Sequence, residues 1–166
     1  MDTSQITEIV KKVIRQQEQN ETMKRTQRLQ DMTLDVAMTV ARGVEERARD
    51  MGVKAVVAVT NRGANPVLVH CMDDSFIASY DVAMGKAYTV VALKMPTIEL
   101  KSLAQPGGSL YGIQNTNSGR IVIFGGGEPL MSGGCLLGGL GVSGGTEEED
   151  TALAAYGRQL FERLSV

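Results

Sequence analysis

The chain has 166 residues, of which 43% are hydrophobic and 22% charged, as expected for one soluble globular domain. Its formal net charge of -2 excludes the basic surface that nucleic-acid binding requires. No run approaches the roughly 18 continuous apolar residues of a membrane helix. The beginning of the chain also lacks the apolar region of a secretory signal, so we expect a cytoplasmic protein that does not bind membranes.

The first predicted element is a short amphipathic helix over residues 3–17. It carries one apolar stripe, formed by Ile6, Ile9, Val10, Val13 and Ile14. Residues 16–27 are almost wholly polar and offer no core face. We therefore expect residues 1–29, a helix and a polar spacer, to stand apart from a domain formed by residues 30–166.

The middle of the chain predicts a helix, a hairpin and a second helix. The first helix spans residues 31–50 and presents a broad apolar face. Strands at 55–60 and 66–72 flank the turn at 61–65, whose sequence is Asn-Arg-Gly-Ala-Asn. The second helix covers residues 76–93, with Ile77 among the residues expected to face inward. A further helical piece follows at 97–103, after the helix-breaking Pro96.

Glycine is dense from residue 107 to residue 145 and interrupts three short apolar runs. These runs predict strands at 121–124, near 130–131 and at 135–142. Glycine allows positive φ and the close approach of a backbone or a ligand. The two cysteines, Cys71 and Cys135, lie in such apolar runs and are expected to be buried free thiols in a reducing compartment.

The final helix is predicted over residues 147–164. Thr146 and Glu149 have the spacing of a capping box at its start. The order of elements is helix, hairpin, two helices, three strands and helix, with no alternating βαβ units. This order predicts an α+β fold in which helices pack on a five-stranded antiparallel sheet.

Three motifs resemble the GlcG/HbpS family, which includes the C-terminal domain of PduO-type cobalamin adenosyltransferases. They are SYDVAMGKAYT at 79–89, GGEPL at 126–130 and GGLGVSGGTEEED at 138–150. The resemblance implies a profilin-like or PAS-like fold, dimers or octamers, and binding of haem or corrinoid in some members. It implies no established reaction, and 166 residues leave no room for the adenosyltransferase's catalytic domain.

His70 is the first candidate cofactor-binding residue, because it is the chain's only imidazole for haem iron or cobalt. Strand alternation directs His70 and Cys71 to opposite faces, so the two are not expected to form one metal site. A structural or interface histidine is the alternative. In one member of the resembled family a histidine ligand belongs to the N-terminal helical region, where this chain has none; Met32, Met38 or Tyr80 would have to replace it.

Lys86, Gly126 and Gly127 are the other candidates. The Lys86 charge would meet a propionate or phosphate of a bound tetrapyrrole, or else pair with an acid at a subunit contact. The turn at 125–129 would cradle a ligand with its backbone N–H groups, or else be a sharp strand connection.

No catalytic set is predicted. The chain has one histidine, no plausible Cys–His pair and no zinc-binding spacing, and capping explains the acids at the helix starts. The leading hypothesis is a non-enzymatic tetrapyrrole-binding or accessory protein, for haem or cobalamin, linked to diol or glycerol metabolism. The alternatives are a structural or assembly oligomer of the same fold without cofactor, and an enzyme acting on a small metabolite.

Two partners are expected. One is the chain itself, in a dimer or octamer. The other is a bacterial microcompartment shell, because residues 1–18 resemble the short terminal helices that direct enzymes into such compartments. The alternative for this helix is packing on its own domain or on a neighbouring subunit.

Overall fold

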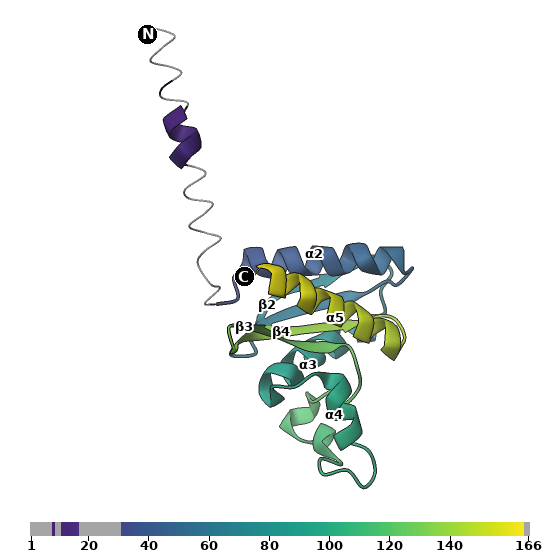
Figure 1. The fold of residues 1–166 in the computed structure, drawn as a ribbon. Coiled ribbons are helices and arrows are strands. Elements are labelled where there is room, and N and C mark those ends of the chain that lie inside the picture. Colours follow the sequence, from purple (N-terminus) through teal and green to yellow (C-terminus); the bar gives the residue numbers. More distant parts are fainter. Residues whose placement is uncertain (1–7, 9–10, 17–30, 165–166) are drawn as a thin grey trace.

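The computed structural model describes residue 8, residues 11–16 and residues 31–164 (Figure 1). Residues 11–16 are helical. Most of the segment predicted to be an address, residues 1–18, and most of the spacer lie outside the described residues. The domain boundary at residue 30 therefore stays a prediction.

The sheet has four antiparallel strands in the spatial order β2-β1-β4-β3. Their bounds are β1 Val56–Asn61, β2 Pro66–Cys71, β3 Gly127–Ser132 and β4 Cys135–Ser143. The α+β class, the antiparallel pairing and the hairpin turn between β1 and β2 are confirmed. The prediction of a fifth strand is wrong, because the sheet that the described residues form has four strands.

The missing strand is the apolar run at 121–124. This run follows the short 3-10 helices η1 (Ile113–Asn115) and η2 (Asn117–Gly119), and it pairs with no strand of the described sheet. The Val122 amide donates instead to the Thr89 hydroxyl at 2.9 Å. A short apolar run has the same composition whether it pairs in a sheet or packs under a helix, so periodicity could not separate the two.

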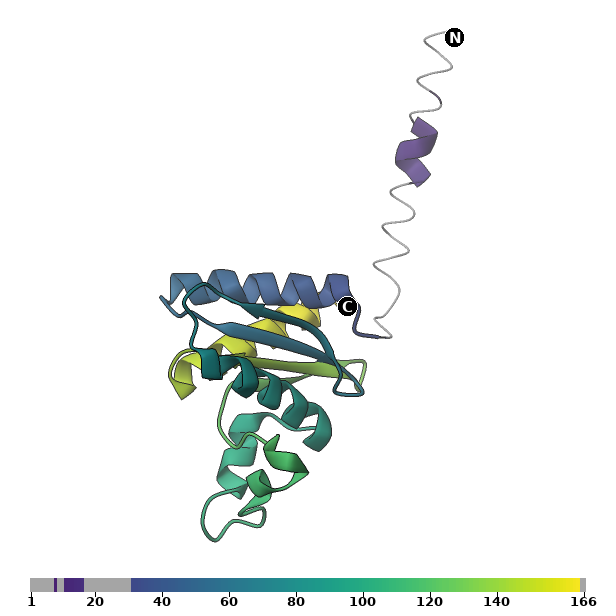
Figure 2. The same ribbon diagram turned by 180° about the vertical axis from the view of Figure 1, so that it is seen from behind.

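Helices cover both faces of the sheet (Figures 1 and 2). On one face, α2 (Leu34–Asp50) and α5 (Glu147–Leu164) pack together over the larger part of the core. On the other face lies α3 (Ile77–Leu93), with α4 (Thr97–Leu103) and the 104–126 segment beside it. The capping box of α5 is confirmed by two hydrogen bonds, Glu149 N to Thr146 Oγ1 and Thr146 N to Glu149 Oε2.

Glycines on β4 allow α3 to lie directly against the sheet. A Cβ atom at Gly141 would lie 2.0 Å from the Ala83 carbonyl oxygen, and one at Gly139 would lie 2.4 Å from that of Ala87. Any side chain here would push the helix away from the strand. The predicted role of glycine in close backbone approach is confirmed at these two positions.

Three residues expected inside are exposed. Cys71 ends the edge strand β2, and Cys135 follows the tight turn that joins β3 to β4. Both thiols are therefore at the surface, contrary to the prediction. Ile77 is 96% exposed at the first turn of α3, because the helix reaches the sheet only further along.

We expect Gly141→Ala to lower the free energy of unfolding by about 3 kcal/mol, because the new methyl group meets backbone that cannot move without shifting α3. Urea unfolding measures the change. The control is Gly63→Ala in the β1–β2 turn, where the nearest atom to a Cβ is the Asn65 side-chain nitrogen at 3.0 Å. That variant should change stability by about 0.5 kcal/mol or less. Equal effects in the two variants would contradict the packing argument.

Candidate functional site

A surface cleft of about 630 Å³ lies where the end of α2 meets the edge strand β2. This volume falls within the range of about 300–1,000 Å³ that small-molecule sites occupy. The polar residues that line it are Glu45, Arg49, Lys54, His70, Cys71, Asp73 and Asp74. The cleft brings together the single imidazole of the chain and charged groups of both signs.

His70 is held in this cleft by Glu45. Leu68 of the same strand and Met72 just after it pack on the α2 side of the sheet, and His70, which alternates with them, contacts Glu45 of α2. Its Nδ1 lies 2.5 Å from Glu45 Oε1. The other carboxylate oxygen of Glu45 lies 3.5 Å from Arg49. Within the described part of the chain, His70 Nε2 has no hydrogen-bond partner.

Two cations lie at the rim of the cleft. The side chains of Arg49 and Lys54 are 59% and 57% exposed. Lys54 Nζ lies 2.7 Å from Asp74 Oδ2, and this hydrogen bond holds the pKa of Asp74 below its usual value. Sequence reasoning missed Glu45, Arg49 and Lys54 as site residues. They come from α2 and the segment after it, and meet β2 only in the folded chain, so no local spacing marks them.

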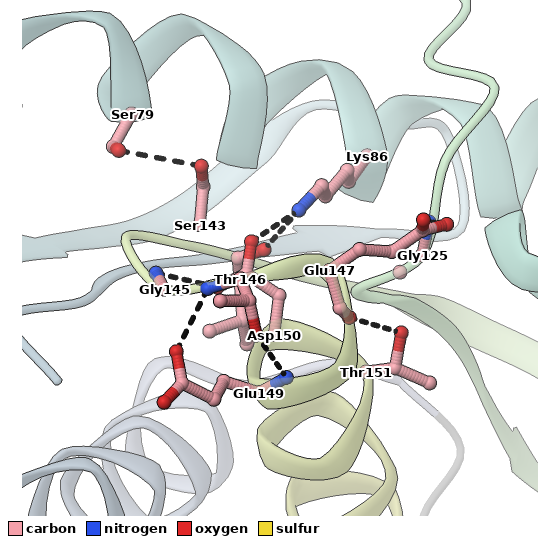
Figure 3. A network of polar contacts seen from close by, with 12 residues as sticks. Ser79, Lys86, Gly125, Ser143, Gly145, Thr146, Glu147, Glu149, Asp150 and Thr151 are labelled. Carbon is pink, nitrogen blue, oxygen red and sulfur yellow. Dashed lines mark hydrogen bonds and ion pairs between the residues drawn. The ribbon is translucent and has the colours of Figure 1, made fainter.

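Lys86 lies elsewhere, in the interior between α3, β4 and the start of α5 (Figure 3). It is fully buried, and its Nζ donates to Asp150 Oδ2 and to the Val142 carbonyl oxygen, each at 2.7 Å. The Phe124 ring centroid lies 4.9 Å away. Burial lowers the pKa of Lys86 and raises that of Asp150, while their mutual attraction opposes both shifts. The acid that pairs with Lys86 thus belongs to its own chain.

The glycine turn before β3 is held by side chains of the same chain. The Gly125 amide donates to Glu147 Oε1 at 2.8 Å, and the Gly127 amide donates to Thr97 Oγ1 at 2.9 Å. A Cβ atom at Gly126 would lie 2.6 Å from Lys86 Nζ, so this glycine leaves room for the ammonium group. Cofactor binding by Lys86, Gly126 and Gly127 stays a prediction, and none of the three lines the cleft.

The other candidate ligands also lie apart from the cleft. Met32 is buried in the core on the α2 side, whereas Tyr80 is half-exposed on α3. Cys71 lines the cleft together with His70, although the two residues alternate along β2. Among the described residues, no three His, Cys, Asp or Glu side chains are placed to hold a metal ion. None of the helices described has the length and apolarity to cross a bilayer.

Comparison with known proteins relates residues 32–159 to the family described as haem degrading protein HbpS-like. A Citrobacter freundii protein, the uncharacterized 15.0 kDa protein in the dhaT-dhaS intergenic region, is 43% identical over 142 residues. This match covers 86% of this chain and all of that protein. These matches confirm the resemblance predicted from the three motifs.

Two PduO proteins extend the comparison. The corrinoid adenosyltransferase PduO of Salmonella typhimurium is 39% identical over 115 residues, which cover 69% of this chain but 34% of that protein. The chain therefore spans about a third of this relative's length. The crystal structure of a PduOC:heme complex superposes with a TM-score of 0.76 at 35% identity, covering 78% of this chain and 94% of that one.

We expect Lys86→Met to lower the free energy of unfolding by about 3–5 kcal/mol, because it leaves the buried Asp150 carboxylate without its counter-ion. The double variant Lys86→Met/Asp150→Asn removes both charges and should recover part of that loss. Urea unfolding of the two single variants and the double variant completes the cycle. If the loss of unfolding free energy in the double variant equals the sum of the losses in the two single variants, Lys86 and Asp150 do not interact directly.

We expect the stability that Glu147 contributes to depend on pH. Its hydrogen bonds from Lys101 and from the Gly125 amide lower its pKa below the unfolded value of 4.5. A lowered folded-state pKa gives stability that is present above pH 4.5 and is lost as the pH falls through the folded-state value. Glu147→Gln should therefore cost about 1 kcal/mol at pH 7.

The measurement is the free energy of unfolding of both proteins between pH 7 and pH 3. The difference between them should shrink as the pH falls. The control is Glu148→Gln, which removes a charge from the same first turn of α5 at an exposed position. If the stability of both variants depends on pH in the same way, the effect comes from a negative charge at the start of α5, and the contacts to Lys101 and Gly125 do not cause it.

Proposed function

The chain belongs to the family described as haem degrading protein HbpS-like, and from this premise we propose that it is a non-enzymatic tetrapyrrole-binding accessory protein. The observation that carries the proposal is the cleft at the edge of the sheet, in which Nε2 of His70 has no hydrogen-bond partner among the residues that the structure describes. The structure of a heme complex of the related PduOC supports haem as the first ligand to test.

The donor set fits a metal that brings its own equatorial ligands. The chain has a single histidine and so supplies one imidazole, whereas a bare transition-metal ion is held by several protein ligands. A tetrapyrrole brings four nitrogens to its own metal, so the single imidazole of His70 would be enough to hold it. A bound haem would supply an iron centre for ligand binding or electron transfer, and His70 would hold it.

The rim of the cleft holds two cations that could meet an anionic periphery, next to the carboxylates of Glu45, Asp73 and Asp74. Arg49 and Lys54 are exposed cations beside His70, and guanidinium and ammonium groups bind carboxylates. Haem carries two propionates, whereas the side chains of cobalamin are mostly neutral amides. We therefore propose haem as the ligand in preference to cobalamin. Arg49 and Lys54, in place of Lys86, would contact its propionates.

A second candidate is an assembly role for the same fold. Phe76, Ile77 and Tyr80 form an exposed apolar group at the start of α3, and a subunit contact would cover it. The predicted dimer or octamer belongs to this proposal. The place in diol or glycerol metabolism and the microcompartment address in residues 1–18, both expected from the sequence, belong to this proposal as well.

Titration of the purified full chain with haemin tests the leading function. We expect a Soret shift that saturates at one haem per chain, and at least tenfold weaker binding by His70→Ala because the axial imidazole is lost. Cys71→Ser, one residue along the same strand, is the matched control and should bind normally. The same titration with cobalamin compares the two tetrapyrroles.

The rim is tested by Arg49→Gln, which should weaken haemin binding about threefold through the loss of one exposed ion pair. Arg47→Gln is its control, because Arg47 is also exposed on the last turn of α2 but does not line the cleft. No Soret shift in the wild-type chain, or equal binding by His70→Ala, would reject the proposal and leave the assembly role.

A further inference from the structure

The contact between Glu45 and His70 is the best-shielded polar contact of the cleft. Its two side chains are 14% and 31% exposed, and the two atoms lie 2.5 Å apart. Two further ion pairs of the cleft are more exposed: the Arg49 side chain, which pairs with Glu45, is 59% exposed, and the side chains of Lys54 and Asp74 are 57% and 79% exposed. Glu45 projects from α2 and His70 from β2, so both partners stand on regular elements that fix their positions.

The chemistry of the two groups decides where the proton lies. An ionised carboxylate only accepts hydrogen bonds, so Nδ1 of His70 must donate. Arg49 places a positive charge 3.5 Å from the second oxygen of Glu45. With the proton on Nδ1, the neutral ring has its lone pair on Nε2. This nitrogen has no partner among the described residues of the chain.

We propose that Glu45 is a positioning residue that holds His70 as the Nδ1–H tautomer and so makes Nε2 the donor to a tetrapyrrole metal. A carboxylate behind a ligating histidine orients the ring and raises its basicity. The stronger donor stabilises the more highly charged ferric iron over ferrous iron. The role of Nε2 as a metal ligand rests on the function proposed above. The tautomer of His70 does not, because it is a property of the protein without ligand.

The tautomer is tested first, on the full chain without haem. Because His70 is the only histidine, ¹⁵N-labelled histidine gives one pair of ring signals that needs no assignment. We expect the Nδ1–H tautomer in the wild-type chain. Glu45→Ala should shift the ring toward the Nε2–H form that free histidine prefers, whereas Glu46→Ala, at the next and exposed position of α2, should leave the signals unchanged.

The metal part is tested with haemin and its dithionite-reduced form. Glu45→Gln keeps an oxygen that can accept from Nδ1 but removes the charge. We expect the ratio of ferric to ferrous haem affinity to fall about tenfold in this variant. This change raises the midpoint potential by about 59 mV for a one-electron couple. Glu46→Gln is the matched control and should keep the wild-type potential.

The outcomes separate this inference from the proposed function. An Nε2–H tautomer in the wild-type chain overturns the positioning role of Glu45, even if haem binds. An Nδ1–H tautomer with no haem binding rejects the proposed function and, with it, the metal role of Nε2. Haem binding with the same potential in wild type and Glu45→Gln overturns the charge effect. The Nδ1–H tautomer together with the raised potential supports the inference in full.

Discussion

The arrangement of the elements depends on one buried ion pair, between Lys86 and Asp150. Lys86 comes from α3 on one face of the sheet, and Asp150 comes from α5, which packs on the other face. The Val142 carbonyl of β4 accepts a second hydrogen bond from the same ammonium group. A buried charge that loses its partner costs several kcal/mol, so neither helix can leave its place without the other. The pair therefore ties both layers to the end of the sheet.

The glycines of the last third make this pair geometrically possible. Without side chains at Gly139 and Gly141, α3 lies close enough for Lys86 to reach the backbone of β4. Gly126 leaves space beside the ammonium, and Asp150 also accepts a hydrogen bond from the Gly145 amide. The motifs that carry the family resemblance thus meet at one interior point. Their spacing follows from packing and charge pairing.

Local signals in the sequence predicted the parts of the fold that depend on neighbouring residues. The Thr146 capping box, the hairpin turn and the helix over 147–164 are confirmed for this reason. The prediction of a strand at 121–124 is wrong. This run bonds to Thr89, which is far away in the chain, and the local sequence does not show that contact. In the candidate site, His70 was found as the single histidine. Its partner Glu45 lies 25 residues away and carries no mark that separates it from other helix acids.

The interior ion pair and the cleft differ in what they allow. Lys86 is fully buried, and its ammonium group donates hydrogen bonds to Asp150 and to the Val142 carbonyl oxygen of the same chain. The cleft lies against β2, an edge strand with one neighbour, and there the Arg49 and Lys54 side chains keep most of their surface in water. One imidazole per chain binds a metal from one side only. In the proposed complex, this single ligand gives weaker and more readily exchanged binding than two would give.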